Sequence, residues 1–79
     1  MVRLIFTASF KKSFKKIDGT MKKKVFNQIS KLKMNPNLGK PMRFSRKGSR
    51  EIHVKPYRLS YVFEDDKVVL LRVYHKDKQ

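Results

Sequence analysis

The sequence predicts an α+β fold, in which two N-terminal helices pack on one face of a small antiparallel sheet in the order β-α-α-β-β-β. Two observations support this prediction. Apolar residues recur at helical spacing between residues 10 and 32, whereas they alternate with polar residues at strand spacing after residue 50. At 79 residues, the chain is expected to form one domain that spans residues 1–79.

The N-terminal part of this order is a strand followed by a helix. Residues 3–7 form a short β-branched and aromatic run, which predicts the first strand. Phe10, Phe14 and Ile17 then follow i, i+4, i+7 spacing with lysines between them, which predicts a short amphipathic helix. We expect this helix to end at residues 18–19.

The second helix is predicted from three sequence signals, which are an N-cap residue, an apolar stripe and a stop signal. Thr20 is expected to cap its N-terminus, and residues 35–37 (Asn-Pro-Asn) are expected to stop it. Its apolar stripe is formed by Met21, Val25, Ile29 and Leu32. The two helices are therefore expected to pack on each other and on one face of a sheet, leaving the other face partly open.

The sheet is predicted from the rest of the chain. Residues 41–44 are expected to form a short edge segment and residues 46–49 a basic turn. Residues 50–55 are expected to form a strand that turns at Pro56.

The last two strands are predicted to form a hairpin. In residues 57–64 the aromatic and apolar side chains point one way, while Arg58 and Ser60 point the other. Residues 64–67 are a polar hairpin connection. Residues 68–75 begin with an almost continuous apolar run, which predicts a central strand buried on both faces.

The charge of the chain points to a polyanionic partner. Lysine and arginine total 21 against six acidic residues, which gives a net charge of +15. A lysine-rich surface of the thermophilic kind would also be rich in glutamate, but here glutamate occurs only at Glu51 and Glu64. A nucleic-acid backbone or an acidic protein would relieve the self-repulsion of such a chain.

Several classes of site and location are excluded or disfavoured. The chain has no cysteine, so disulfides and thiolate metal sites are excluded, and its two histidines form no zinc motif. No apolar run approaches the roughly 18 residues that cross a bilayer. The N-terminus lacks the apolar core and cleavage site of a signal peptide. We expect a cytoplasmic protein that uses no metal or cofactor and does not bind membranes.

Four segments, taken in order, resemble the RelE/ParE toxin superfamily. They are residues 39–42 (Gly-Lys-Pro-Met), 50–52 (Arg-Glu-Ile), 56–61 (Pro-Tyr-Arg-Leu-Ser-Tyr) and 71–76 (Leu-Arg-Val-Tyr-His-Lys). The resemblance covers essentially the whole chain. Its specific part is the basic turn, the Tyr-Arg-x-x-Tyr strand and the closing strand in that spacing. The resemblance implies a toxin of a type II toxin–antitoxin module.

Members of this superfamily act in two ways. RelE-like members cut mRNA in the ribosomal A site, whereas ParE-like members inhibit DNA gyrase. RelE-like cleavage uses the 2′-OH of the substrate to attack the adjacent phosphate, without a metal, and leaves a 2′,3′-cyclic phosphate. The protein must supply a group that takes the 2′-OH proton, positive charge around the phosphate and a donor to the leaving 5′-oxygen.

The resemblance implies a set of candidate catalytic residues. Arg58 matches the arginine of the Tyr-Arg strand and is expected to contact the scissile phosphate, although it could instead pair with Glu51 on the neighbouring strand. His53 stands where relatives usually have lysine or arginine, and Glu51 where several have another basic residue. This departure leaves room for Glu51 or His75 as the base. His75 and Lys76 match the residues that close the last strand, and we expect them beside Arg58.

A second set is expected to bind RNA. Arg43, Arg46, Lys47 and Arg50 are expected to surround the groove and hold mRNA or ribosomal RNA phosphates, together with Lys55. For any one of these residues the alternative is simple solvation. Tyr74 could stack on a base or pack at the edge of the sheet.

The resemblance also implies partners. They are a cognate acidic RelB-like antitoxin that folds on binding, the 70S ribosome with mRNA and ribosomal RNA, and operator DNA only through the antitoxin. The sequence favours a ribosome-dependent mRNA endonuclease, because Arg58, His75 and Lys76 form a cationic, titratable set that an inhibitor does not need. A gyrase inhibitor and a catalytically inactive RNA-binding module remain the alternatives.

Overall fold

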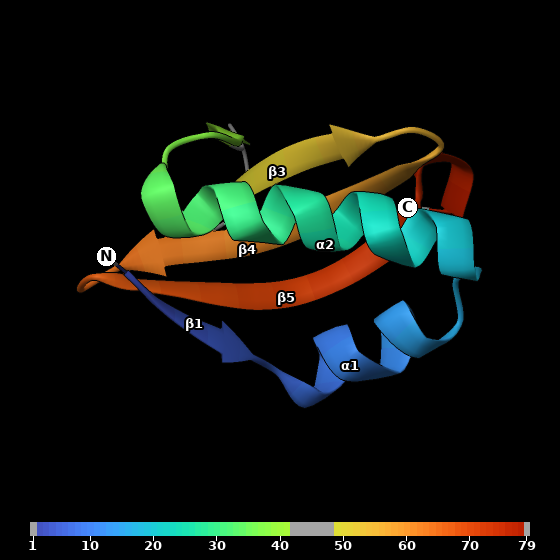
Figure 1. Ribbon diagram of the computed structural model, residues 1–79, viewed down its shortest axis with the longest axis horizontal. Helices are drawn as coiled ribbons and strands as arrows, with labels where there is room; N and C mark the ends of the chain where they lie inside the picture. Colours follow the sequence, from blue (N-terminus) through green and yellow to red (C-terminus); the bar gives the residue numbers. More distant parts are fainter. Residues whose placement is uncertain (1, 42–48, 79) are drawn as a thin grey trace.

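The protein folds into two layers, a five-stranded sheet and two helices that cover one of its faces (Figure 1). The structure is a computed structural model that describes residues 2–41 and 49–78. Its elements in chain order are β1 (Arg3–Phe6), α1 (Ala8–Lys15), α2 (Gly19–Met34), β2 (Lys40–Pro41), β3 (Ser49–Val54), β4 (Tyr57–Glu64), β5 (Lys67–His75) and a 3₁₀ turn (Lys76–Lys78). The predicted α+β fold is confirmed.

Each helix begins at a side chain that accepts a backbone hydrogen bond. The N–H of Phe10 donates to Thr7 Oγ1 (3.0 Å), and the N–H of Met21 donates to Asp18 Oδ1 (2.8 Å). The prediction that Thr20 caps α2 is wrong, because Asp18 already takes the extended cap conformation and Gly19 enters the helix. The helix ends at Met34, before the predicted Asn-Pro-Asn stop.

The core lies between α2 and the sheet. All four residues of the predicted stripe on α2 are buried, and they meet the apolar side chains that β3, β4 and β5 direct to the same side. The sheet residues of this core are Ile52, Val54, Leu59, Tyr61, Val68, Leu70 and Val73. Burial of this stripe fixes α2 on one face of the sheet, and no helix in the described residues lies on the opposite face.

The sheet has the strand order β1-β5-β4-β3-β2. The pairs from β2 to β5 are antiparallel, as predicted, but β1 pairs with β5 in parallel, from Arg3 opposite Lys67 to Phe6 opposite Leu70. The sheet is therefore mixed. A parallel neighbour is possible here because the two helices and the β2–β4 segment separate β1 from β5 in the chain.

Strand β5 is central, as predicted, but it is not buried on both faces. Val68, Leu70 and Val73 are buried, whereas Val69 and Leu71 are only half-buried. The second face of the strand belongs to the open side of the sheet, which neither α1 nor α2 covers (Figure 1).

A bulge changes the alternation of β5 part-way along the strand. Ser60 pairs with Arg72 and Tyr61 with Leu70, so Leu71 has no partner on β4. Before the bulge Leu70 faces the helices, and after it Val73 and His75 do so. A bulge of this kind re-aims every side chain that follows it.

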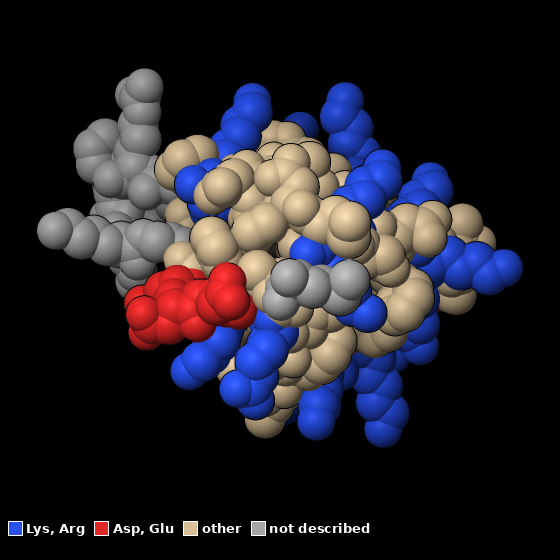
Figure 2. Space-filling view, turned by 60° about the vertical axis from the view of Figure 1, so that its left-hand side comes forward, with Lys and Arg blue, Asp and Glu red and all other residues tan. Residues whose placement is uncertain are grey.

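Part of the predicted edge and turn lies outside the described residues. Strand β2 contains only Lys40 and Pro41 of the expected edge region, and residues 42–48, with Arg43, Arg46 and Lys47, are not described. In the part of the chain that is described, no helix has the length and apolar character needed to cross a membrane. Figure 2 shows acidic side chains gathered where β4 turns into β5, while lysine and arginine side chains are spread over the rest of the visible surface.

Candidate active site

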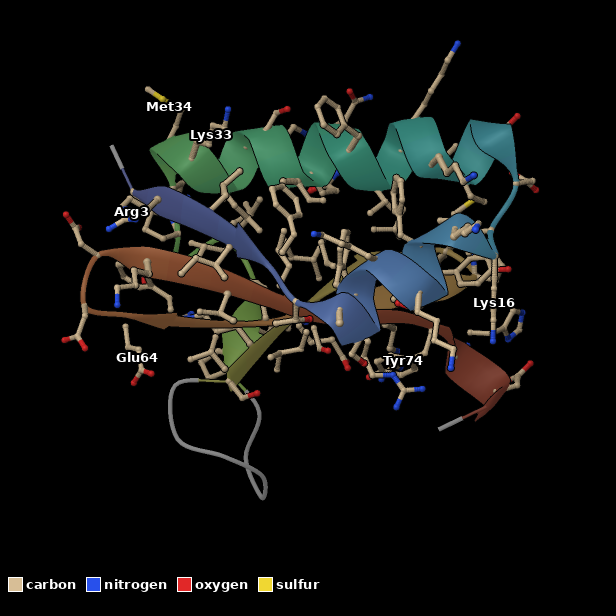
Figure 3. The ribbon with its side chains drawn as sticks, turned by 90° about the horizontal axis from the view of Figure 1, so that it is seen from below. Arg3, Lys16, Lys33, Met34, Glu64 and Tyr74 are labelled. Carbon is tan, nitrogen blue, oxygen red and sulfur yellow. The ribbon has the colours of Figure 1, made fainter. Side chains whose placement is uncertain are left out.

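The open face of the sheet carries a cluster of polar side chains from three strands. Directly opposed residues of antiparallel strands share a face, and the register opposes His53 to Arg58 and Arg58 to Tyr74. Glu51 lies two residues before His53 on the same strand and therefore on the same face. Figure 3 shows Tyr74 on the side of the sheet away from α2. We call Glu51, His53, Arg58 and Tyr74 the open-face cluster.

Glu51 is the centre of this cluster. Its side chain is only 10% exposed, and Arg58 Nη1 donates to its Oε1 at 3.0 Å. The hydroxyl of Tyr74 donates to its other oxygen, Oε2. His53 Nε2 lies 3.7 Å from Oε1. Side chains from all three strands thus converge on a single carboxylate, and the pairing of Arg58 with Glu51 that the sequence left open is present.

The arginine and the histidine of the cluster are accessible from solvent. The Arg58 side chain is 27% exposed and that of His53 is 49% exposed, above the buried carboxylate. A guanidinium at this position can bind a phosphate group and stabilise charge that develops on it. A carboxylate and an imidazole within reach of the same point can take and return a proton.

Tyr74 serves the cluster as a hydrogen-bond donor. Burial, together with the hydrogen bond to Glu51 and the charge of that carboxylate, raises the pKa of the Tyr74 hydroxyl to about 12, against the opposing effect of Arg58. The phenol therefore keeps its proton at neutral pH and orients Glu51. The Arg72 guanidinium lies 5.3 Å from the centroid of the Tyr74 ring, at the distance of a cation–π contact.

His75 is not part of this cluster. It is opposed to Tyr57 and shares the helix-covered face, where the two rings meet edge to face at 5.4 Å between centroids. The expectation that His75 lies beside Arg58 is wrong. The bulge at Leu71 shifts the in-out alternation of β5 by one residue, so His75 faces the helices and Tyr74 lies opposite Arg58. His75 Nδ1 accepts a hydrogen bond from the N–H of Asp77 (3.2 Å).

Arg50 also lies on the covered face. Its Nη1 donates to the carbonyl oxygens of Gly39 (2.8 Å) and Asn37 (3.4 Å), so it ties the loop after α2 to the sheet. The expectation that Arg50 lines the RNA groove does not match this position. The signal was present in the sequence, since Arg50 lies two and four residues before the inward-facing Ile52 and Val54 and therefore on the same face of the strand.

The remaining predicted residues lie at one end of the sheet. Lys55 is exposed where β3 turns into β4. Lys76 is exposed directly after β5, and its backbone N–H donates to the carbonyl of Pro56 (3.0 Å). Neither residue belongs to the open-face cluster, but both add positive charge near it.

Two residues of the motif strands have roles that the sequence analysis missed. Tyr61 is fully buried, accepts a hydrogen bond from the N–H of Gly39 and donates one to the carbonyl of Pro36, both at 2.8 Å. Its burial raises the pKa of the Tyr61 hydroxyl. Because both hydrogen bonds join it to backbone groups of the loop after α2, this tyrosine is structural. Arg72 lies on the open face opposite Ser60, which simple alternation along β5 would not have predicted.

The sequence from residue 4 to residue 79 matches the family described as the ParE toxin of the type II toxin–antitoxin system parDE. The chain belongs to this family. It is therefore a toxin of a type II toxin–antitoxin system, within the predicted RelE/ParE superfamily. No curated protein sequence matches it significantly. Among the residues that the structure of this toxin describes, no three His, Asp or Glu side chains are grouped so that they could hold a metal ion.

Solved structures of RelE toxins share the fold of this toxin. The RelBE2 toxin–antitoxin complex of Mycobacterium tuberculosis contains a chain that is 28% identical, with 95% of this chain and 98% of that chain covered and a TM-score of 0.80. The isolated RelE toxin of E. coli is 17% identical over 100% of this chain and 88% of that chain (TM-score 0.85). The RelB–RelE complex of Methanococcus jannaschii gives 22% identity over 92% and 91% (TM-score 0.80).

Proposed function

We propose that this toxin is a ribosome-dependent, metal-independent endonuclease that cleaves mRNA in the A site and so inhibits translation. The observation that supports it best is the open-face cluster. A guanidinium, an imidazole and a buried carboxylate meet on the uncovered face of the sheet, and these are the group types that 2′-OH attack on a phosphodiester requires.

In this proposal the RNA phosphate binds at Arg58. The guanidinium already has one donor committed to Glu51, and its remaining N–H groups can bind phosphate oxygens. As the phosphate becomes five-coordinate, the added negative charge develops beside a fixed cation. Arg58 therefore stabilises the transition state more than the bound substrate, which is what accelerates the reaction.

The proton transfers are assigned to Glu51 and His53. The Glu51 carboxylate takes the proton of the 2′-OH while the 2′-oxygen forms its bond to phosphorus. The bond between phosphorus and the 5′-oxygen then breaks, and protonated His53 gives a proton to that oxygen. The products are a 2′,3′-cyclic phosphate and a free 5′-OH, and the proton on Glu51 returns to His53 across the 3.7 Å that separates them.

The other candidate residues act on binding. Tyr74 holds Glu51 and offers the face of its ring to a neighbouring base. Lys55 and Lys76 add positive charge for RNA phosphates at the end of the sheet, and His75 binds RNA away from the reacting phosphate. Arg43, Arg46 and Lys47 lie outside the described residues, and we propose that they also bind RNA. These contacts position the strand without reading its sequence.

The proposed partners follow from charge and from the solved complexes. RelB-type antitoxins are bound to the relatives in the RelBE2 and RelB–RelE structures. With a net charge of +15, this toxin would attract an acidic RelB-like antitoxin and, in its absence, the RNA of the 70S ribosome. Operator DNA would be bound only through the antitoxin.

Inhibition of DNA gyrase is the second candidate, and one observation favours it. The family that matches the sequence is described as the ParE toxin of parDE, and ParE-like members of the superfamily inhibit gyrase. Such an inhibitor would act by binding a protein and would not need a carboxylate held between an arginine, a tyrosine and a histidine.

Primer extension separates the two candidates. Purified toxin is added to programmed ribosomes and, separately, to naked mRNA of the same sequence. We expect cuts at A-site codons only where ribosomes are present. If neither sample is cut, the endonuclease proposal fails, and loss of supercoiling by gyrase in a parallel assay would then support the second candidate.

A pair of histidine variants tests the site itself. We expect His53→Gln to slow single-turnover cleavage on ribosomes by about 10²-fold or more, the usual contribution of a general acid or base. His75→Gln makes the same chemical change on the covered face and is expected to have a much smaller effect. If His75→Gln is the slower variant, the proton transfer belongs at the end of β5.

A further inference from the structure

A second basic site lies beside the open-face cluster, in a groove between α1 and the end of β5. Strand β1 pairs with β5 only as far as Leu70, so α1 runs along the remaining edge of β5. The groove has a volume of about 600 Å³, which is within the usual range for a site that holds a small organic ligand. Its lining residues are Ser9, Lys12, Ser13, Lys16, Ile17, Tyr57, Arg72, Val73, Tyr74 and His75.

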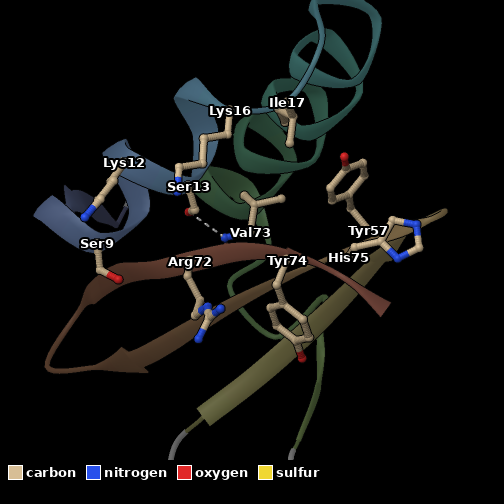
Figure 4. A pocket seen from close by; sticks show the side chains of 10 residues that line it. All are labelled: Ser9, Lys12, Ser13, Lys16, Ile17, Tyr57, Arg72, Val73, Tyr74 and His75. Carbon is tan, nitrogen blue, oxygen red and sulfur yellow. Dashed lines mark hydrogen bonds between the residues drawn. The ribbon is translucent and has the colours of Figure 1, made fainter. Parts of the chain in front are cut away.

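The cations of this groove come from two elements and approach it from opposite sides of β5. Figure 4 shows Lys12 of α1 and Lys16, its C-cap residue, reaching the groove, while Arg72 and Tyr74 project from the other side of the strand. Within residues 2–41 and 49–78, the ion pairs involve only Glu51 and Asp77 as acids. Lys12, Lys16 and Arg72 therefore have no acidic partner in the described part of the chain.

The backbone edge in this groove is already occupied. Ser13 Oγ accepts a hydrogen bond from the N–H of Val73 (3.0 Å) and donates to the carbonyl of Phe10 (3.0 Å). An incoming β-strand would need that N–H, so the groove is not built for strand addition. The groove instead has three cations without an acidic partner beside a strand edge whose Val73 N–H is already hydrogen-bonded. This arrangement suits a ligand with anionic oxygens.

We propose that this groove binds the phosphodiester backbone of the RNA that reaches the open-face cluster, through Lys12, Lys16 and Arg72. The inference rests on the proposed function for the identity of the RNA. Tyr74 belongs both to the cluster and to the groove wall, so a strand whose reacting phosphate lies at Arg58 passes Tyr74 and Arg72 and crosses the edge of β5 toward α1. The groove then holds phosphates next to the reacting one.

An RNA strand fits this groove better than an antitoxin helix does. A helix bound in a groove buries an apolar stripe, and the large apolar side chains exposed in the described structure are elsewhere. They are Ile5, Phe6, Phe26, Met34 and Leu38. The two apolar residues at the base of the groove, Ile17 and Val73, are already buried in the core.

The chain offers a matched control for this inference. α1 carries a second pair of lysines, Lys11 and Lys15, which are exposed but do not line the groove. The double variants Lys12→Gln/Lys16→Gln and Lys11→Gln/Lys15→Gln remove the same charge from α1 and its C-cap. Both are expected to melt like the wild-type protein, because all four side chains are exposed.

Binding is measured with a short single-stranded 2′-O-methyl RNA, which cannot be cleaved, over a series of salt concentrations. Each lost phosphate contact lowers the slope of log K against log salt by about 0.7 for a single strand. We expect the groove variant to lower it by about 1.4, since two contacts are lost, and the control to lower it by clearly less. Arg72→Gln should remove one phosphate contact and so lower the slope by about 0.7.

Chemical protection provides an independent measurement on the unmodified protein. Bound 2′-O-methyl RNA should protect Lys12 and Lys16 from acetylation more than Lys11 and Lys15, as read by mass spectrometry. If the two lysine pairs are equally protected and their variants give equal slopes, the proposal that RNA binds in the groove is wrong. A groove variant that binds RNA normally but loses affinity for an acidic polyglutamate peptide would also overturn the proposal and would assign the groove to a protein.

These outcomes are separable from a failure of the proposed function. If the wild-type toxin does not cut mRNA on ribosomes but the two lysine pairs still differ in RNA binding, the groove stands and the endonuclease proposal fails. If cleavage is observed and the pairs do not differ, only the groove is wrong.

Discussion

Each face of the sheet contains a pair of one arginine and one tyrosine that share a binding partner, and the two pairs have different partners. On the covered face, Arg50 and Tyr61 bind backbone groups of the loop after α2. On the open face, Arg58 and Tyr74 both donate to a side chain, Glu51. The covered pair fixes a loop, whereas the open pair presents a charged group to solvent. The same two residue types therefore give structure on one face and a candidate reactive site on the other.

The packing of this loop on the covered face also explains the glycine at position 39. A Cβ on Gly39 would lie 2.8 Å from Tyr61 Cε1 and hydroxyl and 3.0 Å from the Glu51 carbonyl oxygen. The loop packs directly on the ring and on β3, close to the strand that carries the open-face cluster. The covered face thus sets the position of the strand from which Glu51 and His53 project.

The largest expected effect is loss of the folded state when the packing of α2 on the covered face is disrupted. Met21→Asp places a charge between α2 and the sheet, where Met21 is 7% exposed. An unpaired buried charge costs several kcal/mol, a large part of the roughly 5–15 kcal/mol that keeps a domain folded. We expect no cooperative melting transition by circular dichroism. Thr20→Asp, one position away but exposed, is the control and should melt normally; a normal melt for both would mean that the α2 stripe is not the core.

The next effect separates the two arginines. Removing a donor that stabilises transition-state charge lowers the rate by about 10²–10³, so Arg58→Ala should abolish toxicity while antitoxin binding stays nearly intact. Arg50→Ala should instead lower the free energy of unfolding by about 1 kcal/mol, the worth of a typical hydrogen bond, and leave single-turnover cleavage of the folded fraction unchanged. Wild-type toxicity of Arg58→Ala, or equal loss of cleavage in both variants, would remove the functional difference between the faces.

A smaller effect separates the two tyrosines. Tyr61→Phe leaves the buried N–H of Gly39 without its acceptor, which should cost about 1–3 kcal/mol in the free energy of unfolding. Tyr74→Phe leaves Glu51 still bonded to Arg58 and should cost less. Urea unfolding at neutral pH measures both. If Tyr74→Phe proves the more destabilising variant, the open-face cluster is a folding element as much as a site.

The sequence predicted the elements well because their signals are local. The α2 stripe, the Asn-Pro-Asn stop and the alternation of β4 each depend on residues near one another in the chain. The parallel pairing of β1 with β5 could not be predicted in this way, since it joins residues more than 60 positions apart, such as Arg3 and Lys67. The α2 cap was misplaced by two residues because both Asp18 and Thr20 are good cap residues.

The candidate site was predicted less completely, and one bulge accounts for most of the difference. Continuous alternation from Val68 would place His75 on the open face and Arg72 on the covered face. The unpaired Leu71 reverses both. Bulges are set by pairing with the neighbouring strand, so the sequence of β5 alone does not reveal this one. Glu51, His53 and Arg58 lie on β3 and β4, which the bulge in β5 does not affect. Their shared face could therefore be predicted from alternation.

The smallest expected effect concerns alkaline pH and again compares the tyrosines. The pKa of Tyr74 is raised from 10.0 to about 12 in the folded protein. Between these values the unfolded chain loses its proton first, so the contribution of Tyr74 to stability is complete below pH 10 and is lost as the pH rises toward 12. Relative to wild type, Tyr74→Phe should therefore lose less stability over this pH range, as measured by urea unfolding at a series of pH values.

The two proteins share every titratable group except the phenol of Tyr74, so the difference in stability between wild type and Tyr74→Phe isolates that phenol. Absorbance of ionised tyrosine gives a second measurement, since the raised pKa of Tyr74 makes it a late-titrating group that Tyr74→Phe removes. Identical pH profiles for the two proteins would mean that the hydroxyl of Tyr74 is not held by Glu51 in solution. In that case Arg58 alone would orient the carboxylate, and the open face would be less rigid than the covered one.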